Sequence, residues 1–344
     1  MSSAIRATAP YSKGMPRKAL SPGAAPTTPR RARTAGEGYG ETAEPDWRSI
    51  DWAAHLEQID VDGTPVNYVD IGNGELEPIV FVHGLGGQWQ NWLENIPRAA
   101  AERRVIALDL PGFGCTPEPR DKITISGYGR CVDGLCERLS LGRVDIVGNS
   151  MGGYIAAEVA IQFPERIDQL ILVSAAGITS SDIARRPIQT VGRVAAALAS
   201  YGAARHRHIA ARPKSRHMAL ALVARHPSLL RGDLAYEGFF QGAGKPGFDA
   251  ALRACLEYDF RDRVPEIRQP TLIVWGEKDS ILPVKDAHEF ERLIKDSRKV
   301  VMKDTGHIPM AERPGTFNDL MMEFLAETGP ASDREAVEGE SQAA

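Results

Sequence analysis

The sequence has few cysteines, no long apolar run and little net charge, and each shortage excludes a class of protein. Among 344 residues, Cys115, Cys131, Cys136 and Cys255 show no paired CxxC spacing and no neighbouring histidine cluster. This spacing argues against a disulfide framework or a zinc site. We therefore predict that the cysteines are free thiols in a reducing compartment. No apolar run reaches the roughly 18 residues of a membrane span. The net charge of −4 gives no overall indication of nucleic-acid binding.

Acidic residues are missing from the start of the chain. Residues 1–34 contain seven Lys or Arg and no Asp or Glu, and they are rich in Ala, Pro and Ser. Such a composition buries too little apolar surface to become ordered, so we predict a disordered basic tail at 1–45. The tail also lacks the apolar core of a secretory signal, so we expect a cytoplasmic protein, or an organellar one if the tail is a transit peptide. Residues 328–344 are predicted to form a disordered acidic tail.

Between the tails, short apolar runs alternate with helical patterns. Alternating apolar positions around Asp62-Gly63 predict a hairpin. Further apolar, β-branched runs predict strands at 78–84, 104–114, 143–150, 169–177, 271–279 and 298–307, and helical spacing recurs after Ser150, at 286–296 and at about 315–326. This order predicts an α/β fold, with a mostly parallel sheet that is covered by helices on both faces. Functional residues are then expected at the carboxyl ends of the strands.

One long segment, residues 178–267, interrupts this alternation. It has no clear buried strand, and stretches such as IQTVGRVAAALASY and HMALALVARH have helical spacing. We predict a helical cap at 178–267, inserted after the sixth strand, between two parts of a core at 46–177 and 268–327. From Ser181 to Arg231 this segment carries ten Lys or Arg and one acid, Asp182. Three interpretations stay open: a solvated face, a basic mouth for anionic substrates, or a lid on an anionic membrane surface.

The stretch VGNSMGG lies where a predicted strand ends and a helix begins. Gly-x-Ser-x-Gly in this context predicts a sharp turn that lifts the side chain of Ser150 above the sheet edge. Gly148 and Gly152 supply the small residues that the turn requires, because the backbone folds back on itself there. The helix N-terminus behind Ser150 favours developing negative charge. Ser150 is therefore the candidate nucleophile, and a base must activate it.

A candidate base and a candidate acid follow at later strand ends, in the chain order expected for this turn. His307 in TGHIPMAERP is the candidate base, and Asp279 in WGEKDSILP is the acid that would orient it. Glu277 and Asp304 are the competing acids. The turn form WGxxD, followed by a proline loop, favours Asp279.

The early run FVHGLGG supplies candidate groups for an oxyanion hole. The backbone N–H of Leu85 is one candidate donor, and that of Met151, directly after the serine, is the other. We interpret His83 as a residue that braces this loop. Trp89 and Trp92 are candidates for lining an acyl pocket, with core packing the alternative for at least one of them.

Together these motifs resemble those of the α/β-hydrolase fold family, and in particular its serine hydrolases with a helical cap. FVHGLGG, LDLPGFG, VGNSMGG, WGEKDSILP and TGHIPMAERP match the family's landmarks in order, over roughly residues 55–327. The resemblance implies an α/β-hydrolase fold and a triad of Ser150, Asp279 and His307. It also implies a two-step reaction through an acyl-enzyme, without a metal or an organic cofactor.

The nucleophile narrows the reaction, although the fold hosts many activities. Family members that hydrolyse epoxides or haloalkanes carry aspartate at this position, so Ser150 argues against both. GHIPMAERP resembles carboxylesterases and monoacylglycerol-lipase-like enzymes, which favours a small-molecule carboxylic ester as substrate. GNSMGG is also similar to meta-cleavage carbon–carbon hydrolases, which usually carry a tryptophan soon after the histidine and a substrate-binding arginine in the cap. Here Ile308 follows His307, whereas Arg185 and Arg186 offer the arginine.

Three further functions are alternatives to ester and carbon–carbon hydrolysis. Cofactor-free haloperoxidase or perhydrolase activity uses the same triad. A dinucleotide-binding oxidoreductase also uses a glycine-rich turn, but GNSMGG lacks the G-x-G-x-x-G spacing and lies midway through the sheet. A non-catalytic hydrolase-like binding protein usually lacks a triad residue, and none is missing here.

Overall fold

In the described part of the chain, eight strands form one sheet in the order β1-β2-β4-β3-β5-β6-β7-β8. The structure, a computed structural model, describes residues 38–40, 47–179, 210–240 and 246–327. β2 pairs antiparallel with β1 and β4, and the other neighbours pair in parallel, so the sheet is mostly parallel, as predicted. The strands are β1 Leu56–Val61, β2 Thr64–Ile71, β3 Ile79–Val82, β4 Val105–Leu108, β5 Val144–Asn149, β6 Ile167–Val173, β7 Thr271–Gly276 and β8 Ser297–Met302.

The predicted hairpin is confirmed between β1 and β2. Val61 pairs with Thr64 across a two-residue turn, in which Asp62 and Gly63 have φ values of 51° and 80°. Positive φ at both central residues gives the turn a twist that matches the right-handed twist of the strands. Aspartate and glycine both tolerate this conformation.

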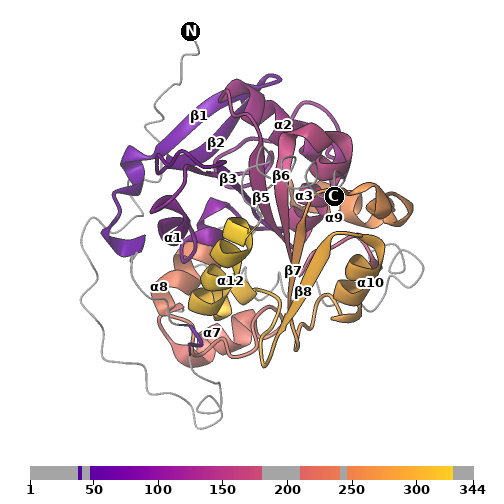
Figure 1. Ribbon diagram of the computed structural model, residues 1–344. Helices are drawn as coiled ribbons and strands as arrows, with labels where there is room; N and C mark the ends of the chain where they lie inside the picture. Colours follow the sequence, from indigo (N-terminus) through magenta and orange to yellow (C-terminus); the bar gives the residue numbers. More distant parts are fainter. Residues whose placement is uncertain (1–37, 41–46, 180–209, 241–245, 328–344) are drawn as a thin grey trace.

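Helices cover both faces of the sheet (Figure 1). The core of one face includes residues of α2 Ile125–Arg138, α3 Met151–Gln162, α9 Phe248–Glu257 and α10 Lys285–Leu293. The core of the other face includes residues of α1 Ile96–Ala100, α11 Pro309–Glu312, α12 Pro314–Glu327 and the short 3₁₀ helix η5 Trp89–Trp92. The helices predicted at 286–296 and about 315–326 correspond to α10 and α12.

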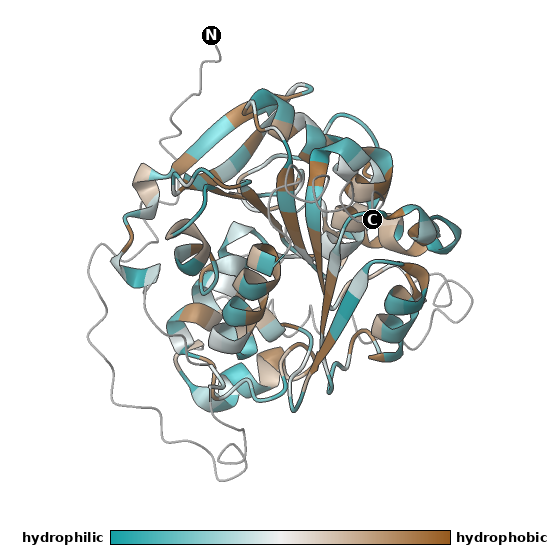
Figure 2. Cartoon of the chain, viewed as in Figure 1, coloured by the Kyte–Doolittle hydropathy of each residue, from teal (hydrophilic) through white to brown (hydrophobic). Residues whose placement is uncertain are grey.

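Successive residues of the central strands point to opposite faces and so enter two separate cores. In β3, Val80 and Val82 belong to the core on the α3 side, while Ile79 and Phe81 belong to the core on the α12 side. All four are fully buried. Strands that are buried on both faces need continuous apolar sequence, and Figure 2 shows the central strands largely in the hydrophobic colour.

Part of the predicted cap is described. α7 Pro213–Leu220, α8 Gly232–Leu234 and the π-helical turn η7 Ala235–Phe240 lie between β6 and β7 in the chain. Among the described residues of 178–267 no strand occurs. α9 falls inside the predicted cap boundaries, yet its buried residues join the core on the α3 side of the sheet. The cap boundaries themselves stay a prediction.

Three residues of the predicted N-terminal tail, 38–40, are described, and Tyr39 and Gly40 lie against the folded part of the chain. Tyr39 is 7% exposed, and the backbone N–H of Gly40 donates to the carbonyl oxygen of Glu312 at 2.6 Å. An aromatic ring buries apolar surface that the neighbouring Ala- and Pro-rich sequence does not offer. Apart from residues 38–40, the tail predicted at 1–45 lies outside the described residues, and its bounds stay a prediction.

Candidate active site

Ser150 occupies the tight turn between β5 and α3, with φ 58° and ψ −118°. Its backbone N–H donates to Val173 O at 2.9 Å, and its carbonyl oxygen accepts from the N–H groups of Tyr154 and Ala176 at 3.1 and 2.9 Å. A residue with a side chain is strained at positive φ. It keeps this conformation where the surrounding contacts hold it there. The strand–turn–helix geometry expected from VGNSMGG is therefore present.

His307 and Asp279 meet beyond the carboxyl ends of β8 and β7. His307 Nδ1 lies 2.8 Å from Asp279 Oδ2, and the two side chains are 6% and 0% exposed. Asp279 Oδ1 accepts from the backbone N–H groups of Ile281 and Leu282 at 2.8 and 2.9 Å. These bonds hold the carboxylate in place. With Nδ1–H donating to Asp279, Nε2 of a neutral His307 is left as a proton acceptor.

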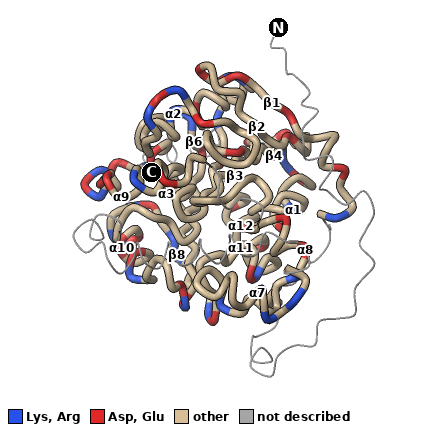
Figure 3. Tube along the Cα trace, turned by 180° about the vertical axis from the view of Figure 1, so that it is seen from behind, with Lys and Arg blue, Asp and Glu red and all other residues tan. Residues whose placement is uncertain are grey.

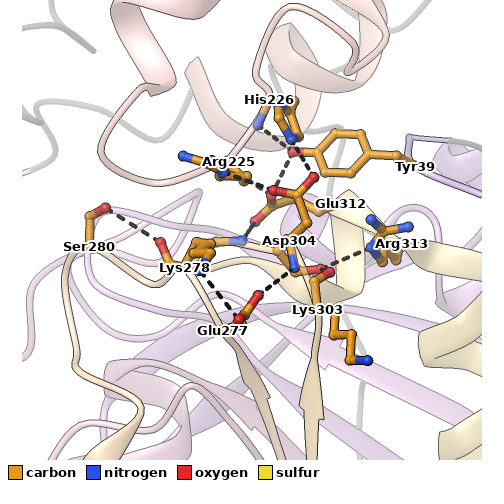
Figure 4. A network of polar contacts seen from close by, with 12 residues as sticks. Tyr39, Arg225, His226, Glu277, Lys278, Ser280, Lys303, Asp304, Glu312 and Arg313 are labelled. Carbon is orange, nitrogen blue, oxygen red and sulfur yellow. Dashed lines mark hydrogen bonds and ion pairs between the residues drawn. The ribbon is translucent and has the colours of Figure 1, made fainter. Parts of the chain in front are cut away.

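The two competing acids have other partners (Figure 4). Asp304 Oδ1 accepts from Arg225 Nε at 2.9 Å, and Oδ2 lies 2.7 Å from His226 Nε2. Burial alone would raise the pKa of Asp304, but hydrogen bonds from His226 and Arg225 hold it below its ordinary value. Glu277 accepts from the backbone N–H of Asp304 at 3.1 Å, a bond that lowers the pKa of Glu277. Both carboxylates are thus engaged away from the candidate base.

Asn149 joins the serine turn to the candidate base. Its Nδ2 donates to Val173 O at 3.1 Å and to His307 O at 3.2 Å, and the residue is buried. An amide nitrogen carries two hydrogens, so one side chain can serve two carbonyl groups. The sequence interpretation missed Asn149, although it stands directly before Ser150 in GNSMGG.

Gly84 brings the candidate oxyanion loop against the serine. A Cβ atom on Gly84 would lie 3.2 Å from Ser150 Cβ, and the N–H of Gly87 closes the loop by donating to Gly84 O at 3.0 Å. Leu85 lies within this loop. Met151 is the first residue of α3, where backbone N–H groups have no intrahelical acceptor. The assignment of Leu85 and Met151 as oxyanion donors stays a prediction.

His83 has the contacts of a bracing residue. The ring is fully buried, with Nδ1 2.8 Å from Gly84 O, and Nε2 accepts from the N–H of Leu110 at 3.0 Å. Because Nε2 accepts, the proton is on Nδ1. Burial lowers the pKa of His83 to about 4, so the ring is neutral at neutral pH.

Trp89 and Trp92 lie in the core on the α12 side of the sheet, and both are fully buried. The ring of Trp89 lies 5.0 Å from that of Trp52, and the ring of Trp92 lies 4.8 Å from that of Phe81. Both rings therefore make core contacts. Core packing was the alternative to an acyl-pocket role for at least one of the two tryptophans. Their contact with a substrate stays a prediction.

The cysteines and histidines of the described residues do not form a metal site. In the described ranges, no three His, Cys, Asp or Glu side chains are grouped so that they could hold an ion. All four cysteines lie in the described ranges, and none of them forms a disulfide there. Burial raises the pKa of Cys131, Cys136 and Cys255 to about 12, so these thiols stay protonated and unreactive.

The described part of the basic stretch presents charge on and beside α7 (Figure 3). Exposed there are Arg212, Lys214, His217 and Met218, the last of them 78% exposed. Within the part of the chain that the structure covers, no helix is both long and apolar enough to cross a bilayer. The three interpretations of the basic stretch stay predictions. Arg185 and Arg186, the candidates for a substrate-binding arginine, lie outside the described residues.

Comparison with known proteins identifies the class. Residues 77–314 match the model of the alpha/beta hydrolase fold family, so the chain belongs to that family and is a hydrolase of that fold. This agrees with the resemblance stated above, and the sheet order and helix layers are those of the same fold.

Proteins similar to this chain include a heptadienoate hydrolase, a phospholipase A and a putative lipase. The chain is 31% identical over 282 residues to the 2-hydroxy-6-oxo-2,4-heptadienoate hydrolase of Pseudomonas putida, a match covering 77% of this chain and 94% of that protein. A crystal structure of a membrane phospholipase A is similar with a TM-score of 0.63 and 26% identity, covering 81% of this chain and 88% of that one. A putative lipase from Acinetobacter baumannii, with a TM-score of 0.65, 22% identity and coverage of 84% and 98%, shows the shared fold alone.

Proposed function

We propose that this hydrolase cleaves a carboxylic ester through Ser150, His307 and Asp279. The observation that supports this proposal is the 2.8 Å contact between His307 Nδ1 and Asp279 Oδ2, and Asn149, next to Ser150, binds the carbonyl oxygen of His307. His307 Nε2 removes the hydroxyl proton of Ser150 as the oxygen attacks the ester carbonyl. The N–H groups of Leu85 and Met151 hold the oxyanion, and the alcohol leaves with a proton from His307.

Water completes the reaction in the second step. His307 again acts as base, water attacks the acyl-enzyme, and the acid leaves as Ser150 recovers its proton. Asp279 fixes the tautomer of His307 and stabilises the imidazolium that forms in each step. Its side chain is fully buried, so its charge acts through a medium of lower effective dielectric than water.

Two observations favour an ester over a carbon–carbon bond. Ile308 follows His307 and is buried, at a position near which the meta-cleavage hydrolases usually carry tryptophan. The similarity to the phospholipase A structure, at 26% identity, links this chain to an enzyme whose name denotes ester hydrolysis.

Carbon–carbon hydrolysis is the second candidate. It is favoured by the 31% identity to the Pseudomonas putida dienoate hydrolase, a match that extends over 94% of that enzyme. The same serine triad would serve this reaction. A substrate with a free carboxylate also fits the basic character of the sequence between Ser181 and Arg231.

The experiment is a comparison of the purified protein with Ser150→Ala and Ser140→Ala. Ser140 also has a positive φ, 54°, but follows α2, so its replacement controls for strain at a serine turn. The substrates are p-nitrophenyl esters of increasing chain length, a monoacylglycerol and a meta-cleavage dienoate. A fluorophosphonate probe reports whether Ser150 is nucleophilic.

Ester turnover that Ser150→Ala abolishes and Ser140→Ala retains is the expected result. Turnover of the dienoate alone would instead establish the second candidate. Normal ester turnover by Ser150→Ala, or a wild-type protein that the fluorophosphonate does not label, would contradict the triad.

A further inference from the structure

The backbone around His307 is held by contacts from distant parts of the chain. The N–H of His307 donates to the carbonyl oxygen of Val223 at 2.8 Å, and its own carbonyl oxygen accepts from Asn149 Nδ2 at 3.2 Å. The N–H groups of Gly306 and Ile308, on either side, donate to Glu312 Oε1 at 2.9 and 3.3 Å. We call residues 304–308 the histidine turn. The direction of the His307 side chain follows from this backbone.

Glu312 is the acceptor shared by the histidine turn and the cap. Its side chain is fully buried, and its second oxygen, Oε2, accepts from the backbone N–H of Arg225 at 2.8 Å and from the hydroxyl of Tyr39 at 2.5 Å (Figure 4). An ionised carboxylate can accept all four hydrogen bonds. A protonated carboxyl group would carry a hydrogen of its own, which would face these donors. Burial raises the pKa of Glu312, and the bonds from Tyr39, Arg225, Gly306 and Ile308 oppose that shift.

Tyr39 closes the cluster from the N-terminal side. Its hydroxyl donates to Glu312 and accepts from the backbone N–H of His226 at 2.8 Å. Its ring meets the imidazole of His226 edge-on with centroids 5.2 Å apart, and the guanidinium of Arg313 lies 5.4 Å from the ring centroid. One side chain therefore contacts the cap at His226 and helix α11 at Glu312, which lie 86 residues apart in the sequence.

The backbone of the histidine turn is closely packed against the cap residues and Glu312. A Cβ atom on Gly306 would lie 2.8 Å from Arg225 N, 2.9 Å from Glu312 Oε1 and 2.9 Å from Val223 O. The cap backbone, the carboxylate and the turn are thus packed in direct contact. A shift of Glu312 would be transmitted to the peptide groups on both sides of His307.

We propose that Tyr39 and Glu312 are positioning residues, through which the N-terminal segment and cap residues 223–226 fix His307 against Ser150. This inference rests on the proposed role of His307 as the base. It extends the working active site to a residue that lies more than a hundred positions before Ser150 in the chain. Neither Tyr39 nor Glu312 is required to touch the substrate.

The test compares Tyr39→Phe with Tyr68→Phe. Tyr68 is also buried and also donates from its hydroxyl to a glutamate, Glu57, at 3.1 Å, but it lies on β2. Each variant loses one hydroxyl and keeps its ring, so general loss of stability is matched. The measurements are kcat and KM for a p-nitrophenyl ester, the rate of Ser150 labelling by a fluorophosphonate, and the melting temperature.

Tyr39→Phe is expected to lower kcat and the labelling rate on the order of tenfold, because small misplacement of a catalytic group is costly. Its KM should stay within about twofold of the wild-type value, since the substrate pocket keeps its side chains. Tyr68→Phe should leave both constants unchanged. Equal kcat values for the two variants, both at the wild-type level, would overturn the inference.

A double variant shows whether Tyr39 acts through Glu312. Glu312→Gln places N–H donors toward the donors of Arg225 and Tyr39, so it should lower kcat more than Tyr39→Phe does. If the two residues act as a unit, adding Tyr39→Phe to Glu312→Gln lowers kcat no further. If the fold-losses in kcat of the two single variants multiply in the double variant, Tyr39 does not act through Glu312. A wild-type protein without labelling at Ser150 would remove the proposed function and this inference together, whereas a labelled wild type with an unaffected Tyr39→Phe would remove this inference alone.

Discussion

Gly152 lies so close to Val82 that a Cβ atom on the glycine would be 2.1 Å from the carbonyl oxygen of Val82. The first turn of α3 therefore rests directly on the end of β3. This contact sets the height of Ser150 above the sheet, because Ser150 and Gly152 belong to the same tight turn.

The first prediction is that Gly152→Ala destabilises the protein and removes activity. The methyl group meets backbone atoms that cannot rotate away, so we expect a loss of about 1–3 kcal/mol in the free energy of unfolding. Gly142→Ala is the control, because nothing lies within 4 Å of a Cβ atom there. Urea unfolding of the two variants makes the comparison, and equal stabilities would contradict the close packing.

The second prediction separates the candidate acids. Asp279→Asn should lower kcat by about 10⁴-fold, because the amide favours the wrong tautomer of His307. Glu277→Gln should leave kcat near the wild-type value, since Glu277 is engaged with the backbone of Asp304. The measurement is steady-state turnover of an ester at neutral pH. A larger loss of kcat in Glu277→Gln than in Asp279→Asn would show that Glu277, and not Asp279, is the acid that orients His307.

The third prediction concerns Asn149. Asn149→Ala removes two bonds to buried carbonyl groups and should cost about 1–3 kcal/mol of stability together with a loss in kcat on the order of tenfold. Asn318→Ala also removes a buried amide, which donates to Glu94 O at 2.9 Å from helix α12. It should lose stability but keep kcat. If both variants keep kcat, the bond from Asn149 to His307 has no catalytic consequence.

The fourth prediction is a pH dependence of stability that arises at His83. Burial lowers the pKa of His83 from 6.5 to about 4, so the folded state favours the neutral ring. The resulting stability is fully present above pH 6.5 and is lost as the pH falls toward 4, by about 3 kcal/mol at pH 4. Urea unfolding of the wild type and of His83→Gln at both pH values tests this. The variant should lose about 3 kcal/mol less than the wild type over this interval.

The sheet and the candidate triad could be predicted because their signals are local. Each central strand is a short continuous apolar run, and each triad residue follows one of those runs by a few positions. Parallel strands bring their carboxyl ends to one edge, so residues far apart in the chain converge without any further information.

Helix α2 shows where local signals fail. Gly127, Gly129 and Gly134 lower the helix propensity of this segment, which hides its amphipathic pattern. Its start nevertheless has a signal, since Thr124 Oγ1 accepts from the N–H of Gly127 at 2.9 Å as an N-cap. Packing against α3 and β1 outweighs the weak propensity.

The bonds that Glu312 accepts from Tyr39 and Arg225 could not be predicted from the sequence, because these partners lie far away in the chain. A single tyrosine in a Gly-rich stretch, EGYGE, carries no periodicity. Glu312 stands in TGHIPMAERP, five positions after His307, and nothing in the residue type alone predicts its burial. Its bonds to Gly306 and Ile308 are local, so a carboxylate five positions after the candidate base was an available signal.

Backbone groups of Val223 and Arg225 bind His307 and Glu312, and these two bonds do not depend on the side chains that the two residues carry. Val223 offers a carbonyl oxygen and Arg225 offers an N–H, and any amino acid supplies the first while any except proline supplies the second. Mutations can therefore replace the side chains of this stretch without removing either bond. Variation in residues 223–226 would therefore remove the side-chain bonds from Arg225 and His226 to Asp304 but leave the backbone bonds to His307 and Glu312 in place.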